Sequence, residues 1–517
     1  MATPIADTRA DGDGLDRATF DTALAARGIK LNRDEADSVF ALARWLSEGV
    51  AALDDTAAVD ETRAAADLPI GEAGKRLRSG QLTSVDLVRA ALARIAERDR
   101  DYRSFYVVDA ERALAAALRA DAELAAGHDR GPLHGIPVGI KDMIDVESLA
   151  TTAGSRGRAG RVAAQDAAVV TRLIDGGAVI LGKLATYEWG TVGPAFDTLY
   201  PPARNPWSLE HITGGSSSGC AAAVAGGLLR TSIGTDTGGS VRGPAAYCGV
   251  VGLKPTHGLV PTAGVLAMSP SMDHVGPMSA TTAEAALTLD VISGRSGAEA
   301  ASALLGQPIA GLRIAYARDW FARDPQATAE VVAAMDAAVS TLSQLGTSIE
   351  QVTLPEYSAI EVAAAAVLHK ESFDAHAGDL AARPEGYGRK TYQSLVAGAV
   401  VTAAEYAKAK RVGEAFRRRL DTDIFARFDA LVTVGTLTPA LPVALFGKGS
   451  VWTPMRTIGF NLSGHPALVL PMGFADGLPL GMQLVGRHFG EARLCQIGDA
   501  FERATDFALQ RPPQPPR

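Results

Sequence analysis

Hydrophobic positions in the first part of the chain repeat with the spacing of a helix. Three apolar residues share one face of a short helix: Phe20, Ala23 and Leu24. Asn32, followed three residues later by Glu35, indicates the cap of a second helix. The apolar residues of that helix form one stripe: Val39, Leu42, Leu46, Val50 and Leu53. With a mobile tail over residues 1–15 and an Ala/Asp/Glu/Thr-rich linker after the second helix, we expect a helical hairpin extension over residues 1–67.

From residue 68 onward, helical and strand patterns alternate, which is typical of an α/β domain. A helix capped by Thr83 or Ser84 carries an apolar face, and the run Phe105–Val108 reads as a short strand. A helix over Asp166–Gly177 leads directly into a strand over Ala178–Gly182. Further strands are predicted at 312–316, 430–434 and 480–486, and further helices at 284–293, 325–345, within 355–425 and at 491–507.

Residues 214–258 gather glycine and serine into two turns, GGSSSG and GTDTGGS. Apolar runs at Ala221–Ala225 and Val250–Leu253 separate this stretch from a flexible linker, which would lack them. Glycine lets backbone N–H groups approach a ligand closely, so such turns suit a developing negative charge beside a nucleophile. Upstream, Lys141 follows the apolar run Pro137–Ile140.

These three segments together resemble the amidase signature hydrolases. The family pattern is a lysine in a PVGIKD-like segment, a GGSSSG turn and a GTDTGGS-R block, and all three stand here in that order. The resemblance implies an α/β fold with a mixed central β-sheet flanked by helices, the amidase signature fold. We therefore assign residues 68–510 to an amidase signature catalytic domain that follows the N-terminal helical extension.

The resemblance also implies a Ser-cisSer-Lys triad. Lys141 is the base and acid, Ser216 relays the proton, and Ser240 is the nucleophile that forms an acyl-enzyme. The apolar residues before Lys141 supply the kind of buried site that lowers the pKa of a lysine. Family members hold the relay serine across a cis peptide bond, which we expect between Ser216 and Ser217. Ser217 and Ser218 are the rivals of Ser216 for the relay.

Backbone N–H groups are implied as an oxyanion hole, and three side chains as its supports. The expected donors are Thr237, Gly238, Gly239 and Ser240. The expected supporting residues are Ser217, Asp236 and Arg242, and for the last two a structural ion pair is a compatible interpretation.

Several other reactive side chains are better explained by packing. His134 belongs to the approach to the Lys141 strand, Lys183 to a structural segment, and Cys220 to helix packing. His211 stands where the family often has arginine and is a candidate rim residue. Neither an H-E-x-x-H motif nor a Cys/His cluster occurs, so we expect no metal and no cofactor.

Composition narrows the class of protein further. The 517 residues are 47% hydrophobic and 21% charged, as in ordinary globular enzymes. The net charge of −8 argues against direct nucleic-acid binding, although a docked partner could supply a basic surface. The absence of a long apolar run or a secretory pattern, and three widely spaced cysteines, indicate no membrane association and a cytoplasmic location.

The sequence predicts an amidase that hydrolyses C–N bonds of small-molecule amides, with anilides, carbamates and urea-like compounds as candidate substrates. The alternative is the glutaminase (A-type) subunit of a tRNA-dependent amidotransferase, which shares the motifs. A scaffold without activity is disfavoured because Lys141, Ser216 and Ser240 are all present. The N-terminal hairpin either covers the enzyme's surface or forms a homodimer contact, and the pocket walls are expected from the variable region 355–460.

Overall fold

The computed structural model describes residues 16–26, 28–33, 35–37, 39–40, 43–44, 65–447 and 451–513. The chain forms two compact units, Met1–Ala64 and Ala65–Arg517. The predictions for the tail, for Leu42, Leu46, Val50 and Leu53, and for most of the linker lie outside the described residues.

In the N-terminal unit, helix α1 (Arg17–Ala25) begins at Asp16, whose side chain accepts a hydrogen bond from Thr19 N. Phe20 is its buried residue, and its ring lies 5.3 Å from that of Phe40. The predicted cap is present in reciprocal form. Glu35 N donates to Asn32 Oδ1 at 2.9 Å, and Asn32 N donates to Glu35 Oε2 at 2.9 Å.

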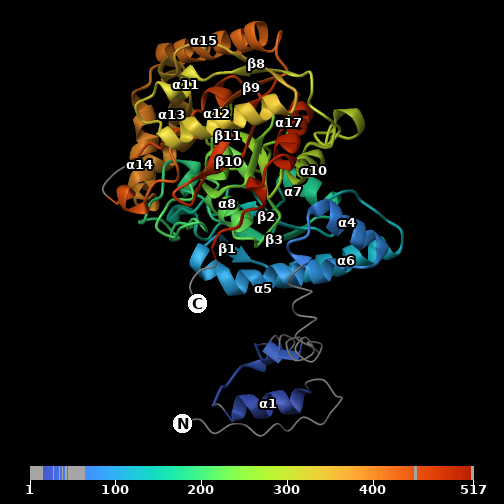
Figure 1. Cartoon of the computed structure of the whole chain (residues 1–517). Helices are drawn as coiled ribbons and strands as arrows, with labels where there is room; N and C mark the ends of the chain where they lie inside the picture. Colours follow the sequence, from blue (N-terminus) through green and yellow to red (C-terminus); the bar gives the residue numbers. More distant parts are fainter. Residues whose placement is uncertain are drawn as a thin grey trace. The chain divides into compact units, whose positions relative to one another are not determined.

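Within residues 65–513, eleven strands form one mixed sheet in the order β1-β3-β2-β4-β6-β5-β10-β11-β9-β7-β8 (Figure 1). Strands β3, β2 and β4 are parallel to one another, as are β9, β7 and β8, and the other neighbouring pairs are antiparallel. The strands are β1 Phe105–Val108, β2 Pro137–Lys141, β3 Val179–Leu184, β4 Thr231–Asp236, β5 Val251–Lys254, β6 His274–Ser279, β7 Arg313–Tyr316, β8 Ser348–Gln351, β9 Ala430–Val434, β10 Ala467–Ala475 and β11 Leu478–Val485.

Helices cover both faces of this sheet. They are α4 Ile70–Ser79, α5 Ser84–Tyr102, α6 Ala110–Ala125, α7 Ala168–Asp175, α8 Ser218–Ala225, α9 Arg242–Cys248, α10 Thr282–Ser293, α11 Asp319–Ala322, α12 Ala329–Gln344, α13 Tyr357–Ala382, α14 Arg389–Val396, α15 Ala403–Arg419, α16 Gly459–Leu462 and α17 Glu491–Arg503. None of the described helices is long and apolar enough to cross a membrane.

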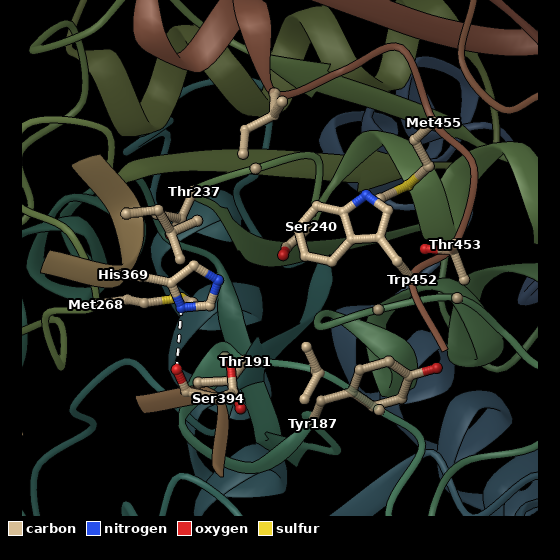
Figure 2. Close-up of a pocket in the computed structure, with 18 of the residues that line it drawn as sticks. Tyr187, Thr191, Thr237, Ser240, Met268, His369, Ser394, Trp452, Thr453 and Met455 are labelled. Carbon is tan, nitrogen blue, oxygen red and sulfur yellow. Dashed lines mark hydrogen bonds between the residues drawn. The ribbon is translucent and has the colours of Figure 1, made fainter. Parts of the chain in front are cut away.

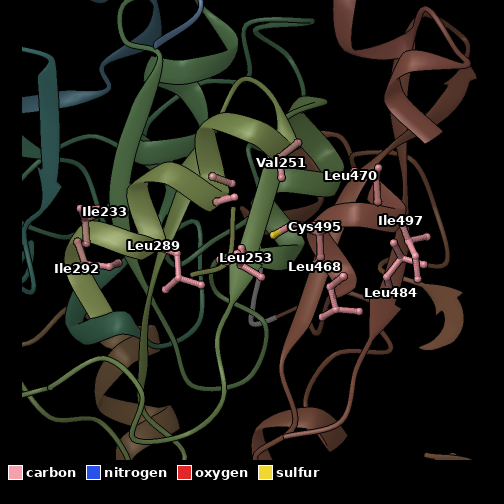
Figure 3. Packing of buried hydrophobic residues seen from close by; sticks show 14 of the residues in the cluster. Ile233, Val251, Leu253, Leu289, Ile292, Leu468, Leu470, Leu484, Cys495 and Ile497 are labelled. Atoms are coloured by element: carbon pink, nitrogen blue, oxygen red, sulfur yellow. The ribbon is translucent and has the colours of Figure 1, made fainter. Parts of the chain in front are cut away.

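The core has one apolar layer on each side of the sheet. Leu468 and Leu470 of β10 join the layer under α10, α12 and α17, whereas Val469 between them joins the layer under α8 and α9. This alternation is the period of two that a strand imposes. Figure 3 shows residues of the first layer, including Leu289 and Ile497 from its helices.

The predicted fold class is confirmed, and most predicted elements occur with small shifts at their ends. The capping alternative resolves in favour of Thr83, whose side chain accepts from Asp86 N while Asp86 caps Thr83 in return. The helix predicted over Asp166–Gly177 is α7, which begins at Ala168, and the following strand extends to Leu184. Strands β4, β6 and β8 were not predicted.

Candidate active site

Lys141 is the last residue of β2, which lies between the parallel strands β3 and β4. Its side chain is fully buried. The side-chain nitrogen Nζ donates to Ser216 Oγ at 2.7 Å and to Thr235 Oγ1 at 2.8 Å. Strand pairing therefore delivers the lysine to one of the serines of the GGSSSG turn, as the sequence predicted, and to a threonine that it did not predict.

Burial lowers the pKa of Lys141 to about 7, because the charged form loses its hydration. Cys220, Asp236 and Asp273 act in the opposite direction, but their effect is smaller. Near neutral pH, a large fraction of this lysine is therefore an uncharged amine with a lone pair that can accept a proton.

The turn that presents Ser216 contains a cis peptide bond, and it joins Gly215 to Ser216. The prediction of a cis bond between Ser216 and Ser217 is therefore wrong by one residue. A side chain at Gly215 would place its Cβ 2.2 Å from the Tyr187 ring, so only glycine fits there. The carbonyl of Ser216 accepts from Tyr187 N at 3.0 Å, which fixes the turn against the neighbouring segment.

Neither rival serine contacts the lysine. Ser217 Oγ donates to the carbonyl of Thr235 at 3.1 Å, and its N–H donates to the carbonyl of Ser240 at 3.2 Å. Ser218 begins α8, and its hydroxyl faces the carbonyl of Ala185 at 3.4 Å. The geometry thus selects Ser216 as the neighbour of Lys141 and gives Ser217 a place between β4 and the Ser240 turn.

The turn that carries Ser240 is wrapped around the carboxylate of Asp236. Its oxygens accept from Gly239 N at 2.8 Å and Val241 N at 3.1 Å, and it forms an ion pair with Arg242 at 2.9 Å. Burial alone would raise the pKa of Asp236, but Arg242 and the hydrogen bonds outweigh burial and hold this pKa below its usual range. The pair predicted from the sequence is therefore formed, and it is completely buried.

Residues far along the chain complete this network. Arg242 also donates to Gln483 Oε1 at 2.8 Å and to Asn461 Oδ1 at 2.6 Å, and Thr457 Oγ1 donates to the carbonyl of Gly238 at 2.7 Å. A Cβ at Gly239, whose φ is +127°, would lie 2.2 Å from Thr457 Oγ1. Sequence reasoning missed these partners because no local motif marks them.

The same contacts show which backbone donors are free at this turn. Within the described residues, the N–H groups of Thr237, Gly238 and Ser240 have no hydrogen-bond partner. The N–H of Gly239 is already committed to Asp236 Oδ1. Gly239 therefore drops out of the donor set that the sequence predicted.

A pocket opens beside this turn, with an empty volume of about 700 Å³ that includes its open mouth. Ser240 lines it, and Figure 2 shows Ser240 among the aromatic and hydroxyl side chains of the wall. The apolar part of the wall consists of Met268, Leu368, Val451, Trp452, Met455 and Ile458. Among the lining residues that the structure describes, none is Asp, Glu, Lys or Arg.

His369 of α13 supplies a neutral polar group in this wall (Figure 2). Its Nδ1 lies 3.0 Å from the carbonyl of Ser394. Since a carbonyl only accepts, Nδ1 carries the proton and Nε2 is left with a lone pair. Burial lowers the pKa of His369, so the ring is uncharged at neutral pH.

The side chains that the sequence assigned to packing lie away from this chemistry. Lys183 pairs with Asp142 at 3.0 Å, and His134 Nε2 lies 3.1 Å from Glu123 Oε2. Cys220 is buried on α8. His211, the candidate rim residue, is not among the described residues of the pocket wall, and its Nδ1 lies 2.8 Å from Ser208 Oγ.

The fold and the site define an amide C–N hydrolase. The Amidase family model matches residues 86–495, and the chain belongs to this family, the amidase signature family.

Relatives of two kinds share its sequence. The A-type subunit of the glutamyl-tRNA(Gln) amidotransferase of Chloroflexus aggregans is 37% identical over 480 residues, which cover 86% of this chain and 98% of that protein. The structure of a peptide amidase from Stenotrophomonas maltophilia is 32% identical, with a TM-score of 0.74, and covers 86% of this chain and 98% of its own. The structure of the corresponding amidotransferase subunit from Thermotoga maritima is 28% identical with a TM-score of 0.67, covering 86% of this chain and 94% of its own.

Proposed function

We propose that this protein hydrolyses small, uncharged amides through an acyl-enzyme on Ser240. The observation that carries the proposal is the buried contact of Lys141 Nζ with Ser216 Oγ beside a pocket that Ser240 lines. An uncharged lysine is a base strong enough to activate a serine hydroxyl, which is a weak nucleophile on its own.

In the proposed reaction, Lys141 takes the proton of Ser216, and Ser216 takes the proton of Ser240. Ser240 Oγ then bonds to the amide carbon while the carbonyl electron pair moves to oxygen. When the C–N bond breaks, the leaving nitrogen receives the proton back from Lys141 through Ser216. Water repeats the sequence, releases the acid and restores the Ser240 hydroxyl.

The relay requires the Ser240 hydroxyl to meet Ser216 Oγ. No hydrogen bond joins the two hydroxyls among the described contacts. Hydrogen bonds of this kind are often long without substrate and shorten when it binds. Support for the relay comes from the bond between Ser217 N and the carbonyl of Ser240, which ties the two turns together.

We assign the oxyanion hole to the free N–H groups of Thr237, Gly238 and Ser240. Their availability supports this role, because a donor already bonded elsewhere would have to break that bond to help. Asp236 and Arg242 hold the turn that presents these donors, and Ser217 holds it to β4.

The wall of the pocket favours an uncharged substrate with an apolar group. Free glutamine would bring an ammonium and a carboxylate into a wall whose described residues carry no charge, and desolvating these groups without partners is costly. A neutral amide avoids this cost, and an N–H or O–H of the substrate can donate to Nε2 of His369.

The curated relatives favour a second candidate, the glutaminase (A-type) subunit of a tRNA-dependent amidotransferase. Sequence identity to one such protein reaches 37% over nearly its whole length. In this case glutamine would need a charged partner, and the sequence has Lys448 three residues before Val451, outside the described residues. A glutaminase of this kind would act together with partner subunits and tRNA.

An assay of the purified full chain separates the two candidates. The panel contains a chromogenic anilide, primary amides, ureas and carbamates, and glutamine with and without partner subunits and tRNA. We expect turnover of neutral apolar amides by the chain alone, and a loss of about 10⁴-fold in kcat for Ser240→Ala. Turnover of glutamine only, dependent on partners and reduced in Lys448→Met, would establish the second candidate instead.

A further inference from the structure

Three potential metal ligands meet outside the catalytic pocket. They are Asp421, in the π-helical turn Leu420–Ile424 after α15, His465, just before β10, and His488, just after β11. Each offers one ligand atom, and these atoms lie within 4.8 Å of one another. None of the three is among the described residues that line the catalytic pocket.

The spacing of the ligand atoms suits a divalent metal. His465 Nε2 lies 3.1 Å from Asp421 Oδ1, and His488 Nδ1 lies 3.7 Å from the same oxygen. Ligands about 2.0–2.1 Å from a tetrahedral zinc ion are themselves roughly 3.4 Å apart, which falls between these two distances. Two imidazoles and one carboxylate form a donor set that zinc accepts, and an open fourth position would take water.

Neighbouring groups support these ligands in the required state. Burial lowers the pKa of His465 to about 2, so its ring is neutral and keeps a lone pair for a metal. Ser463 Oγ lies 3.1 Å from Nδ1 of His465 and can accept its proton, which leaves Nε2 free to coordinate. Arg417 lies 3.7 Å from Oδ2 of Asp421, so Oδ1 remains on the side of the histidines.

The site is also accessible to an ion. The side chain of His465 is buried, whereas those of Asp421 and His488 are 39% and 28% exposed. An ion arriving from solvent would thus meet two reachable ligands first and a fixed one behind them.

We propose that Asp421, His465 and His488 bind one Zn²⁺ ion, separate from the hydrolytic site. The ion would connect the end of α15 to the ends of two central strands, and would stabilise the folded chain because these ligands come together only there. The sequence could not predict the site, since 44 residues separate Asp421 from His465 and no spacing motif results.

Equilibrium dialysis of the metal-free full chain against Zn²⁺ tests the proposal. We expect one bound Zn²⁺ per chain, an affinity about tenfold or more lower in His488→Ala and Asp421→Asn, and no change in His128→Ala, which alters an exposed histidine elsewhere. Both exposed-ligand variants keep buried His465, so they should fold, and circular dichroism checks this.

A second measurement uses Co²⁺, whose visible absorption reports coordination. We expect a Co²⁺ band in the wild type and in His128→Ala that His488→Ala loses, and a higher unfolding temperature when Zn²⁺ is added to the wild type. No stoichiometric Zn²⁺ binding, or equal binding by wild type and His488→Ala, would overturn the proposal. In that case the His465–Asp421 contact is an ordinary buried hydrogen bond.

Discussion

Lys141 is the residue whose protonation decides whether the proposed site can react. Its folded-state pKa of about 7 lies below the ordinary value of 10.5. The folded chain therefore binds fewer protons than the unfolded chain between these two values, and stability should rise with pH across this window. Below pH 7 both states are protonated, and the full penalty of burying the charge remains.

Lys141→Met separates the cost of this charge from its use. We expect the variant to lose about 10⁴-fold in kcat, because no base remains. Its stability relative to the wild type should be highest at and below pH 7, and the difference should shrink by about 1.4 kcal/mol per unit as pH rises toward 10.5. Urea unfolding at a series of pH values measures this difference, and a pH-independent difference would mean that Lys141 is not buried as a neutral amine.

Thr235 tunes the same lysine in this scheme. Its hydroxyl accepts a hydrogen bond from Nζ, which favours the charged form. Thr235→Val keeps the side-chain shape and removes that acceptor, so we expect the acidic limb of the kcat/KM profile to move to lower pH. Thr433→Val, which alters another buried threonine away from the lysine, is the matched control. An unmoved limb in Thr235→Val would assign Thr235 to packing alone.

At the scale of elements, the turn that carries Ser240 depends on a buried ion pair. Arg242→Met would leave Asp236 charged and without its partner in the interior, a change that costs about 3–5 kcal/mol in comparable cases. We expect a correspondingly lower urea midpoint together with reduced turnover. Arg383→Met, which removes an exposed pair with Asp379, should leave the midpoint near that of the wild type. If both variants unfold alike, the buried pair does not hold the turn.

The elements that sequence reasoning missed are those whose polar residues have partners inside the fold. β4 reads TSIGTD and shows no alternation, because it is central and buried on both faces. Its Thr231 hydroxyl is satisfied by Ser279 and Thr288. Single-sequence patterns give no sign of such partners, so a polar buried strand looks like a loop.

The site divides in the same way between what motifs reveal and what only contacts reveal. Lys141, Ser216 and Ser240 stand in recognisable segments and could be assigned from the sequence. Thr235 and Asn461 could not, because their roles depend on strand pairing and on a partner more than 200 residues away. Gly239 shows the limit of a motif: it lies in the predicted donor turn, but its N–H is used by Asp236.

At the scale of the whole molecule, the N-terminal unit is separable by chain position from the unit that holds the site. Ala65 already belongs to the core of the second unit, and Asp67 pairs with Arg94 there. We expect a chain beginning at Ala65 to fold and to hydrolyse amides at a rate comparable to that of the full chain. Light scattering on both chains tests the hairpin as a homodimer contact, since only the full chain would then be dimeric. Loss of hydrolysis in a folded truncated chain would show that the extension takes part in the reaction.

Modification by a fluorophosphonate tests the central claim most directly, because it needs no knowledge of the substrate. Peptide mapping should find a single adduct, on Ser240, and its rate of formation should rise with pH through an ionisation near 7. The rate should fall sharply in Lys141→Met and Ser216→Ala. An adduct on another residue, or a Ser240 rate that ignores both pH and Lys141, would contradict the proposed proton relay from Ser240 through Ser216 to an uncharged lysine.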